Sequence, residues 1–257
     1  MTTSQSPSHA TPRRLEGHTA VVTGSGRGIG LAVATRLAQE GAAVALVDLQ
    51  EPDEAVEALR ATGATVSGYT ADVSDPGSVK ALVAPITETL GAPDILVNNA
   101  GIYPFLKLEE TTIEDWRRVF AINLESVLLT SQAFLPGMKQ RGWGRIVNVT
   151  SNSIALQVPD AAHYTSSKMA VIGLTRGLAT ELAPYGITAN AIAPSLTRTP
   201  GMSFAPDDLM QAAANQQTIK RVGEPEDVVG AVAFLASSDA GFVTAQTLYV
   251  DGGLVRT

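Results

Sequence analysis

The amino-acid sequence predicts a single α/β domain, a doubly wound fold in which a seven-stranded parallel sheet carries helices on both faces. Three observations predict it. Seven short runs rich in Val, Ile and Ala alternate with longer runs of helical periodicity, which is the pattern of repeated βα units. The chain has 257 residues, 45% hydrophobic and 17% charged, enough for one large core. No stretch has the composition of a linker between two domains.

The expected strands are short and buried, and the expected helices lie between them. Strands are expected at 19–23, 43–47, 64–69, 94–98, 145–150, 188–193 and 247–250. Helices are expected at 29–40, 52–61, 77–90, 112–139, 163–184 and 225–238. Glycines that can end a helix follow several of them, at Gly41, Gly63 and Gly186. Right-handed crossovers between parallel strands then favour the doubly wound arrangement.

Composition argues against several functions. The net charge of −7 is unfavourable for binding nucleic acid, which needs a basic face. The chain has no cysteine, which excludes disulfides, thiolate catalysis and cysteine–zinc sites, and its three histidines are scattered, so we expect no metal site. Residues 1–14 are rich in Ser, Thr and Pro, and no apolar run is long enough for a membrane span. We expect a disordered tail over 1–14, a domain over 15–257, a cytoplasmic protein and no membrane partner.

A glycine-rich turn follows the first expected strand. The segment TGSGRGIG at 23–30 leads directly into a helix. A strand, a glycine turn and a helix in this order present free backbone N–H groups and a helix N-terminus to a pyrophosphate. The alternative is a loop that is rich in glycine for steric reasons only. The placement favours a dinucleotide site at Gly24, Arg27, Gly28, Ile29 and Gly30.

Asp48 closes the second expected strand, where a carboxylate can accept hydrogen bonds from both hydroxyls of an adenosine ribose. It would also repel the additional phosphate of NADP. Arg27 could attract that same phosphate, and Asp48 could instead be a helix cap or a surface residue. We give the carboxylate more weight because an unfavourable contact discriminates directly between ligands. The sequence therefore predicts NAD(H), with NADP(H) as the alternative.

Tyr164 and Lys168 are four residues apart at the start of an expected helix, so their side chains share one face. A tyrosine has an ordinary pKa of about 10 and needs a nearby cation to act as an acid or base near neutrality. Such a pair alone is usually a solvated helix face. Ser151, however, ends the preceding strand at the carboxyl edge, where its hydroxyl can hold a substrate oxygen near the tyrosine.

These residues belong to a larger set of motifs. In order along the chain they are TGSGRGIG at 23–30, Asp72-Val73, NNAG at 98–101, Asn123, Ser151, YTSSK at 164–168 and VDGG at 250–253. From residue 15 to its end, the chain resembles the short-chain dehydrogenases/reductases of about 250 residues. The resemblance implies a Rossmann-type fold, a nicotinamide cofactor and a homotetramer.

The resemblance also implies roles for individual residues. Tyr164 would be the general acid and base, and Lys168 would hold the nicotinamide ribose and lower the tyrosine pKa. Ser151 would orient the carbonyl oxygen, and Asn123 would position a water. The cofactor groove would be lined by Asp72, Val73, Asn98, Asn99, Ala100, Gly101, Pro194, Thr197 and Thr199, together with Tyr164 and Lys168. The chain departs from the family pattern at Ser195 and Ala245, where glycine is usual.

Three segments, 102–106, 153–163 and 196–218, are expected to surround the nicotinamide, and the loop 199–218 to close over the substrate. The expected pocket residues are Tyr103, Ser153, Leu156, His163, Met202 and Phe204, some of which could instead pack the core or an interface. Their apolar character favours a small apolar or aromatic alcohol or ketone. Segments such as NNAGIYP at 98–104 resemble the 1-phenylethanol dehydrogenases, and SNS at 151–153 is similar to pyridoxal 4-dehydrogenases. An NADPH-dependent 3-oxoacyl-thioester reductase and a non-catalytic nicotinamide sensor are the alternatives.

Overall fold

The computed structural model describes residues 13–203 and 206–256, which form a sheet of seven parallel strands. The spatial order of the strands is β3-β2-β1-β4-β5-β6-β7. Their bounds are β1 Thr19–Thr23, β2 Ala43–Asp48, β3 Val66–Thr70, β4 Ile95–Asn98, β5 Gly144–Val149, β6 Ile187–Pro194 and β7 Thr247–Val250. The order reverses between β1 and β4, and this is where a doubly wound sheet opens a crevice for a ligand.

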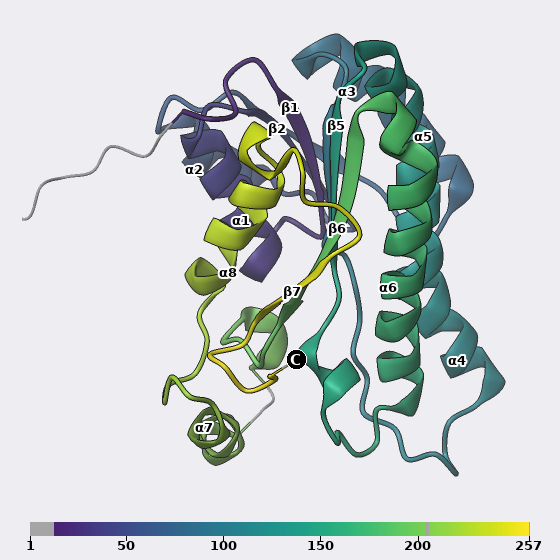
Figure 1. The fold of residues 1–257 in the computed structure, drawn as a ribbon, viewed down its shortest axis with the longest axis vertical. Helices are drawn as coiled ribbons and strands as arrows, with labels where there is room; N and C mark the ends of the chain where they lie inside the picture. Colours follow the sequence, from purple (N-terminus) through teal and green to yellow (C-terminus); the bar gives the residue numbers. More distant parts are fainter. Residues whose placement is uncertain (1–12, 204–205, 257) are drawn as a thin grey trace, which may run out of the picture.

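Helices cover both faces of the sheet (Figure 1), so the predicted fold class is confirmed. On one face lie α1 Gly28–Gln39, α2 Asp53–Arg60 and α8 Pro225–Leu235. On the other lie α3 Pro76–Leu90, α4 Ile113–Phe120, α5 Ser126–Arg141 and α6 Ala162–Leu182. The remaining helix, α7 Asp207–Gln216, lies beyond the carboxyl edge of the sheet.

The core is divided by the sheet into two layers. Along β1, Ala20 and Val22 pack into one layer with α1 and α8, and Val21 packs into the other with α3 and α5. Successive side chains of a strand point to opposite faces, and both faces of a parallel sheet are covered. This double burial explains why the strands appear in the sequence as continuous apolar runs.

Two expectations about connecting segments need correction. The expected loop at 199–218 contains a short 3-10 turn, Pro200–Met202, and the helix α7. Helix α7 begins after Pro206 with Asp207 and Asp208, which stabilise a helix N-terminus, and buries Met210. The expected helix 112–139 is interrupted by a π-helical turn, Ala121–Glu125, between α4 and α5.

The expected tail at 1–14 falls mainly outside the described residues. At its end, Arg14 forms an ion pair with the buried Glu40, with Nη2 and Oε1 2.8 Å apart. Leu15 is fully buried in the core layer beside α1. The described chain is therefore part of the fold from Arg14 onward.

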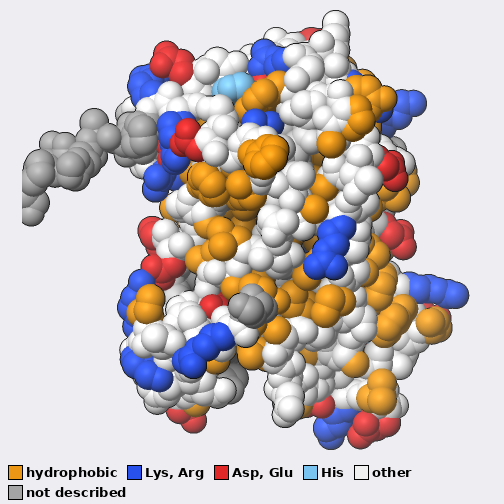
Figure 2. Space-filling view, viewed as in Figure 1, with side chains coloured by type: hydrophobic (Ala, Val, Ile, Leu, Met, Phe, Trp, Pro, Cys, Tyr) orange, Lys and Arg blue, Asp and Glu red, His pale blue; other side chains and the backbone are white. Residues whose placement is uncertain are grey.

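One helical run among the described residues, Ile113–Arg141, has the length and mean hydropathy (1.3) of a membrane-spanning segment. The run is not a single α-helix, because the π turn interrupts it, and α5 packs against β4 and β5. A core helix of a globular protein meets the same two criteria. Leu128 on α5 and Met169 on α6 are exposed apolar side chains. Figure 2 shows hydrophobic side chains at several places on the face that it views.

Candidate active site

The four predicted catalytic residues meet at the carboxyl edge of the sheet. Ser151 follows β5, and Tyr164 and Lys168 lie in the first two turns of α6. The Ser151 and Tyr164 side chains are hydrogen-bonded to each other. Lys168 is buried, and its Nζ donates to the carbonyl oxygen of Val149 at the end of β5, at 2.9 Å. A strand end and a helix start thus bring a hydroxyl, a phenol and an amine together.

Asn123, in the π turn, links the segment after β4 to helix α6, which carries Tyr164 and Lys168. Its Oδ1 accepts from the Ile102 backbone N–H at 2.8 Å, and its Nδ2 donates to the Ile102 carbonyl oxygen at 2.9 Å and to Ser167 Oγ at 3.0 Å. A Cβ on Gly101 would lie 3.1 Å from Asn123 Oδ1 and 3.2 Å from Lys168 Nζ. Glycine at 101 therefore lets the Asn123 and Lys168 side chains both come close to the backbone at this position. Ser167, within the YTSSK motif, is a contact that sequence reasoning missed.

Burial dominates the electrostatics of the site. Burial lowers the pKa of Lys168 from 10.5 to about 8. Burial also raises the pKa of Tyr164, the hydrogen bond from Ser151 opposes this, and the neighbouring Tyr103 adds to it. The direction for Tyr164 is opposite to our expectation, because desolvation of the phenol outweighs any help from Lys168, whose Nζ is 6.0 Å from the Tyr164 ring centroid.

The glycine turn forms one wall of the predicted cofactor groove. Gly28 has a φ of +60° and begins α1, whose first turn has neither a side-chain cap nor an acidic residue. A Cβ on Gly24 would lie 2.9 Å from the Ala100 Cα, and one on Gly30 would collide with the Gly24 carbonyl oxygen. Asn99 Nδ2 donates to that same oxygen at 2.9 Å. Close packing therefore requires Gly24 and Gly30, and the free N–H groups beside Gly28 and Ile29 suit a pyrophosphate.

Asp48 lies beside this turn at the end of β2. Its Oδ2 accepts from the Gly26 backbone N–H at 2.8 Å, and its Oδ1 accepts from the Leu49 N–H at 2.8 Å. Arg27 is exposed, and within residues 13–203 and 206–256 it forms no ion pair. Gly26 had no predicted role, although the extra glycine within the turn was visible in the sequence.

The other predicted groove residues lie at neighbouring strand ends. Val73 is buried just beyond β3, and Asp72 accepts from the Ser74 backbone N–H at 2.9 Å. Across the groove, Pro194 ends β6, and the buried Thr197 donates from Oγ1 to the Ser195 carbonyl oxygen at 2.9 Å. Together with the uncapped α1 and Asp48, these positions fit a dinucleotide that spans the crevice between β1 and β4.

Tyr103 connects the catalytic group to the segment over it. Its ring meets the Tyr164 ring edge-on, with centroids 6.3 Å apart and planes at 75°. Its side chain is hydrogen-bonded to Thr199, and a Cβ on Gly201 would lie 2.5 Å from its Oη. Met202 lines a neighbouring hollow of about 350 Å³ together with Thr199. Phe204 lies outside the described residues.

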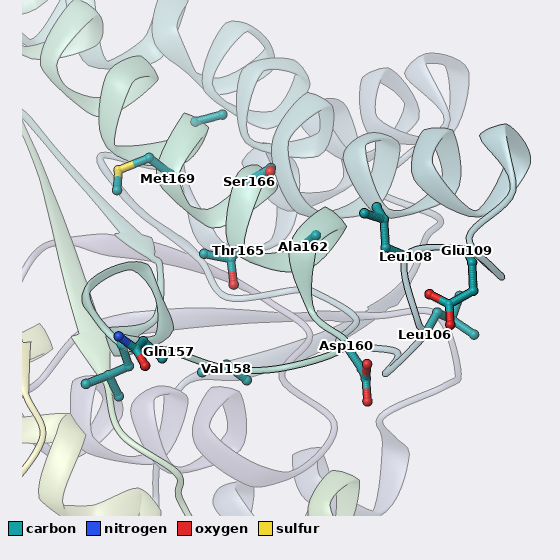
Figure 3. A pocket seen from close by; sticks show the side chains of 12 residues that line it. Leu106, Leu108, Glu109, Gln157, Val158, Asp160, Ala162, Thr165, Ser166 and Met169 are labelled. Atoms are coloured by element: carbon teal, nitrogen blue, oxygen red, sulfur yellow. The ribbon is translucent and has the colours of Figure 1, made fainter.

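The other three expected pocket residues have different surroundings. Ser153 is buried, and its backbone N–H donates to Ser151 Oγ at 3.2 Å. His163 is only 1% exposed, and neither of its ring nitrogens has a hydrogen-bond partner among the described residues. Leu156 lines an open groove of about 930 Å³ between α6 and the loops before it (Figure 3). The groove's apolar lining also includes Leu106, Leu108, Val158 and Met169.

No group of three or more His, Asp or Glu residues in the described parts of the chain is arranged to hold a metal ion. The side chains that meet at the site supply a hydroxyl, a phenol and a buried amine, beside a groove that fits a nicotinamide dinucleotide. The phenol and the amine can exchange protons, and the hydroxyl can orient an oxygen.

Comparison with known proteins agrees with this chemistry. Residues 24–255 match the family model described as enoyl-(acyl carrier protein) reductase. The 3-oxoacyl-[acyl-carrier-protein] reductase FabG of Vibrio cholerae is 38% identical, over 93% of this chain and 98% of that protein. A (2S)-[(R)-hydroxy(phenyl)methyl]succinyl-CoA dehydrogenase subunit of Thauera aromatica is 37% identical, over 93% and 97%. A gluconate 5-dehydrogenase of Burkholderia cenocepacia J2315, solved with NADP and tartrate, matches with a TM-score of 0.89 and 36% identity, covering 95% of this chain and 98% of that one.

Proposed function

The chain belongs to the short-chain dehydrogenase/reductase family of oxidoreductases, and we propose that it interconverts a secondary alcohol and a ketone with NAD(H), on an apolar or aryl-alkyl substrate. The observation that carries the proposal is the hydrogen-bonded Ser151–Tyr164 pair beside the buried Lys168. The relative from Thauera aromatica, named for a secondary alcohol that bears a phenyl ring, supports the substrate class. Tyr103, next to Tyr164, supplies an aromatic wall for such a ring.

Each candidate catalytic residue has a separate role in the proposed reaction. A nicotinamide bound in the groove supplies or accepts the hydride. The Ser151 and Tyr164 hydroxyls are hydrogen-bonded to each other, so they are close enough for one carbonyl oxygen to receive a hydrogen bond from each. Tyr164 donates its proton to that oxygen in reduction and removes the proton in oxidation. Lys168, with a pKa of about 8, places a positive charge near the phenol when it is protonated, and Asn123 fixes the backbone at Ile102 through two hydrogen bonds.

The preference for NAD(H) is supported by Asp48. Its carboxylate is held at the end of β2 by backbone N–H groups on both sides. A phosphate on the adenosine ribose would bring roughly −1.5 to −2 charges to this carboxylate, by analogy with other phosphate monoesters. The ribose hydroxyls of NAD(H) would instead donate hydrogen bonds to it.

An NADPH-dependent 3-oxoacyl-thioester reductase is the second candidate. Arg27 is exposed and has no ion-pair partner in the described chain, so its charge is available to a phosphate. The relative from Vibrio cholerae is named for that reaction, and the gluconate 5-dehydrogenase was solved with NADP. The two candidates differ in both cofactor and substrate, so one experiment separates them.

That experiment compares NADH and NADPH oxidation with acetophenone-type ketones, acetoacetyl thioesters and pyridoxal. Faster turnover of aryl ketones with NADH supports the proposal, and preference for NADPH with thioesters supports the second candidate. Tyr164→Phe keeps the ring and removes the acid. It should lower kcat about 10²- to 10⁴-fold and leave the Kd for NADH unchanged. A Tyr164→Phe variant with normal turnover would refute the assignment of the catalytic acid.

We also propose a cytoplasmic homotetramer that binds neither nucleic acid nor membrane. Exposed apolar side chains on two separate surfaces support two interfaces: Leu128 and Met169 on α5 and α6, and Phe242 and Leu248 near β7. Sedimentation equilibrium tests the assembly. Phe242→Asp should then give a dimer, and a wild-type monomer would refute the proposal.

A further inference from the structure

Gly26 is in contact with the carboxylate on which the cofactor preference rests. Its backbone N–H donates to Asp48 Oδ2 at 2.8 Å. A Cβ at position 26 would lie 3.0 Å from that oxygen and 3.2 Å from the Asp48 Cγ, which is closer than carbon normally packs against either atom. A methyl group at position 26 would therefore push this carboxylate by a few tenths of an ångström from where the structure has it.

The turn that carries Gly26 is tied to β2 by the residue before it. Ser25 Oγ donates to the Val22 carbonyl oxygen at 2.8 Å and accepts from the Val47 backbone N–H at 3.0 Å. The fully buried Ser25 therefore sets the spacing between the turn and the end of β2. These bonds restrain the turn, and with it Gly26, from moving away from Asp48.

Asp48 is restrained from its other side as well. Its Oδ1 accepts from the Leu49 N–H at 2.8 Å and from the Gln50 N–H at 3.4 Å. With Gly26 on Oδ2, the carboxylate is kept in one orientation. A carboxylate free to rotate could turn away from a ribose phosphate, whereas one held in place keeps its repulsion and presents its remaining lone pairs in a constant direction.

We infer that Gly26 is a specificity-determining residue, which sets the preference for NAD(H) by positioning Asp48. This inference rests on the proposed NAD(H)-dependent function. Gly26 is not required by backbone strain, because its φ lies outside the left-handed region that Gly24 and Gly28 occupy. The backbone at 26 can therefore accept alanine, and the effect of the methyl group falls on Asp48.

The test is Gly26→Ala, read by fluorescence titration of the cofactor-free protein with NADH and with NADPH. Coupling between contacting residues predicts that the ratio of the NADPH Kd to the NADH Kd falls about fivefold to tenfold, mainly through weaker NADH binding. Gly230→Ala, on α8, is the matched control, because its Cβ would meet nothing within 4 Å. The control should retain the wild-type ratio, and thermal unfolding checks that both variants are folded.

The same pair of measurements in an Asp48→Asn background separates positioning from general damage to the turn. If Gly26 acts through the carboxylate, Gly26→Ala leaves the ratio unchanged once Asp48 is Asn. An unchanged ratio in the wild-type background, or an equal fall in both backgrounds, overturns the inference while NADH binding stands. A wild-type protein that prefers NADPH contradicts the proposed function itself, and the inference falls with it.

Discussion

Lys168→Met should make the cofactor-free protein more stable while it removes activity. Lys168 is 5% exposed, and burial lowers its pKa from 10.5 to about 8. Each pKa unit corresponds to about 1.4 kcal/mol, so the buried ammonium costs the fold about 3 kcal/mol wherever it is protonated in both states. Methionine has a similar length and carries no charge, but it leaves the Val149 carbonyl oxygen without its donor, a loss of about 1 kcal/mol. The net gain at pH 7 is therefore about 2 kcal/mol.

The gain depends on pH in a defined window. Below pH 8 the lysine is protonated in the folded and unfolded states, and the full cost of burial is present. Between pH 8 and 10.5 the folded protein has lost the proton that the unfolded chain still binds, so the wild type becomes progressively more stable. Above pH 10.5 the cost has vanished, and the variant should be less stable by the lost hydrogen bond.

Urea unfolding of both proteins at pH 7, 9 and 10.5 measures this difference. The comparison between variant and wild type cancels the titration of all other groups. Lys80→Met, on the exposed side of α3, is the control, and it should show no gain at pH 7. A Lys168→Met protein that is less stable at pH 7, or whose gain is the same at pH 7 and 10.5, would refute the argument that burial of this charge is costly.

Three further changes test separate parts of the structure. Ser151→Ala removes the hydrogen bond that lowers the Tyr164 pKa, so the pH profile of alcohol oxidation should shift to higher pH, and an unmoved midpoint would contradict this contact. Gly201→Ala places a methyl group 2.5 Å from Tyr103 Oη, so limited proteolysis should cleave the 199–203 segment faster; cleavage at the wild-type rate would show that the contact does not hold the segment. Asp94→Asn, at the opposite edge of the sheet, removes the charge that pairs with Arg141; urea unfolding should show a loss of about 2 kcal/mol with kcat per folded molecule unchanged.

The fold could be predicted from the sequence because its strands bury both faces. Val21 and Val22 point into different core layers, yet both must be apolar, so the strand is visible as an apolar run. The candidate catalytic residues were visible because their spacing matches the ends of elements: Ser151 after a strand, and Tyr164 and Lys168 one helical turn apart. Helix α7 was missed because its segment begins with Gly and Pro residues that usually indicate a loop.

The electrostatics of the site could not be predicted in the same way. From spacing alone, a lysine four residues after a tyrosine should lower the tyrosine pKa. In the structure, Lys168 Nζ donates to the Val149 carbonyl oxygen, and burial of the Tyr164 phenol raises its pKa. Desolvation depends on everything that packs around a group, so no local pattern contains it.

The π turn at Ala121–Glu125 shows where local pattern and function conflict. Residues 112–139 have continuous helical periodicity, but the helix has to bury side chains in different directions before and after the π turn. Before the turn, Val119 is buried, and after it Val127 is buried and Phe134 packs in the core layer beside the sheet. A π turn contains one residue more than an α turn and so rotates the helix after it by about 100°. The extra residue lets α5 keep its buried face while Asn123 points its amide at Ile102. The helical pattern therefore fails where the buried amide of Asn123 has to reach the Ile102 backbone.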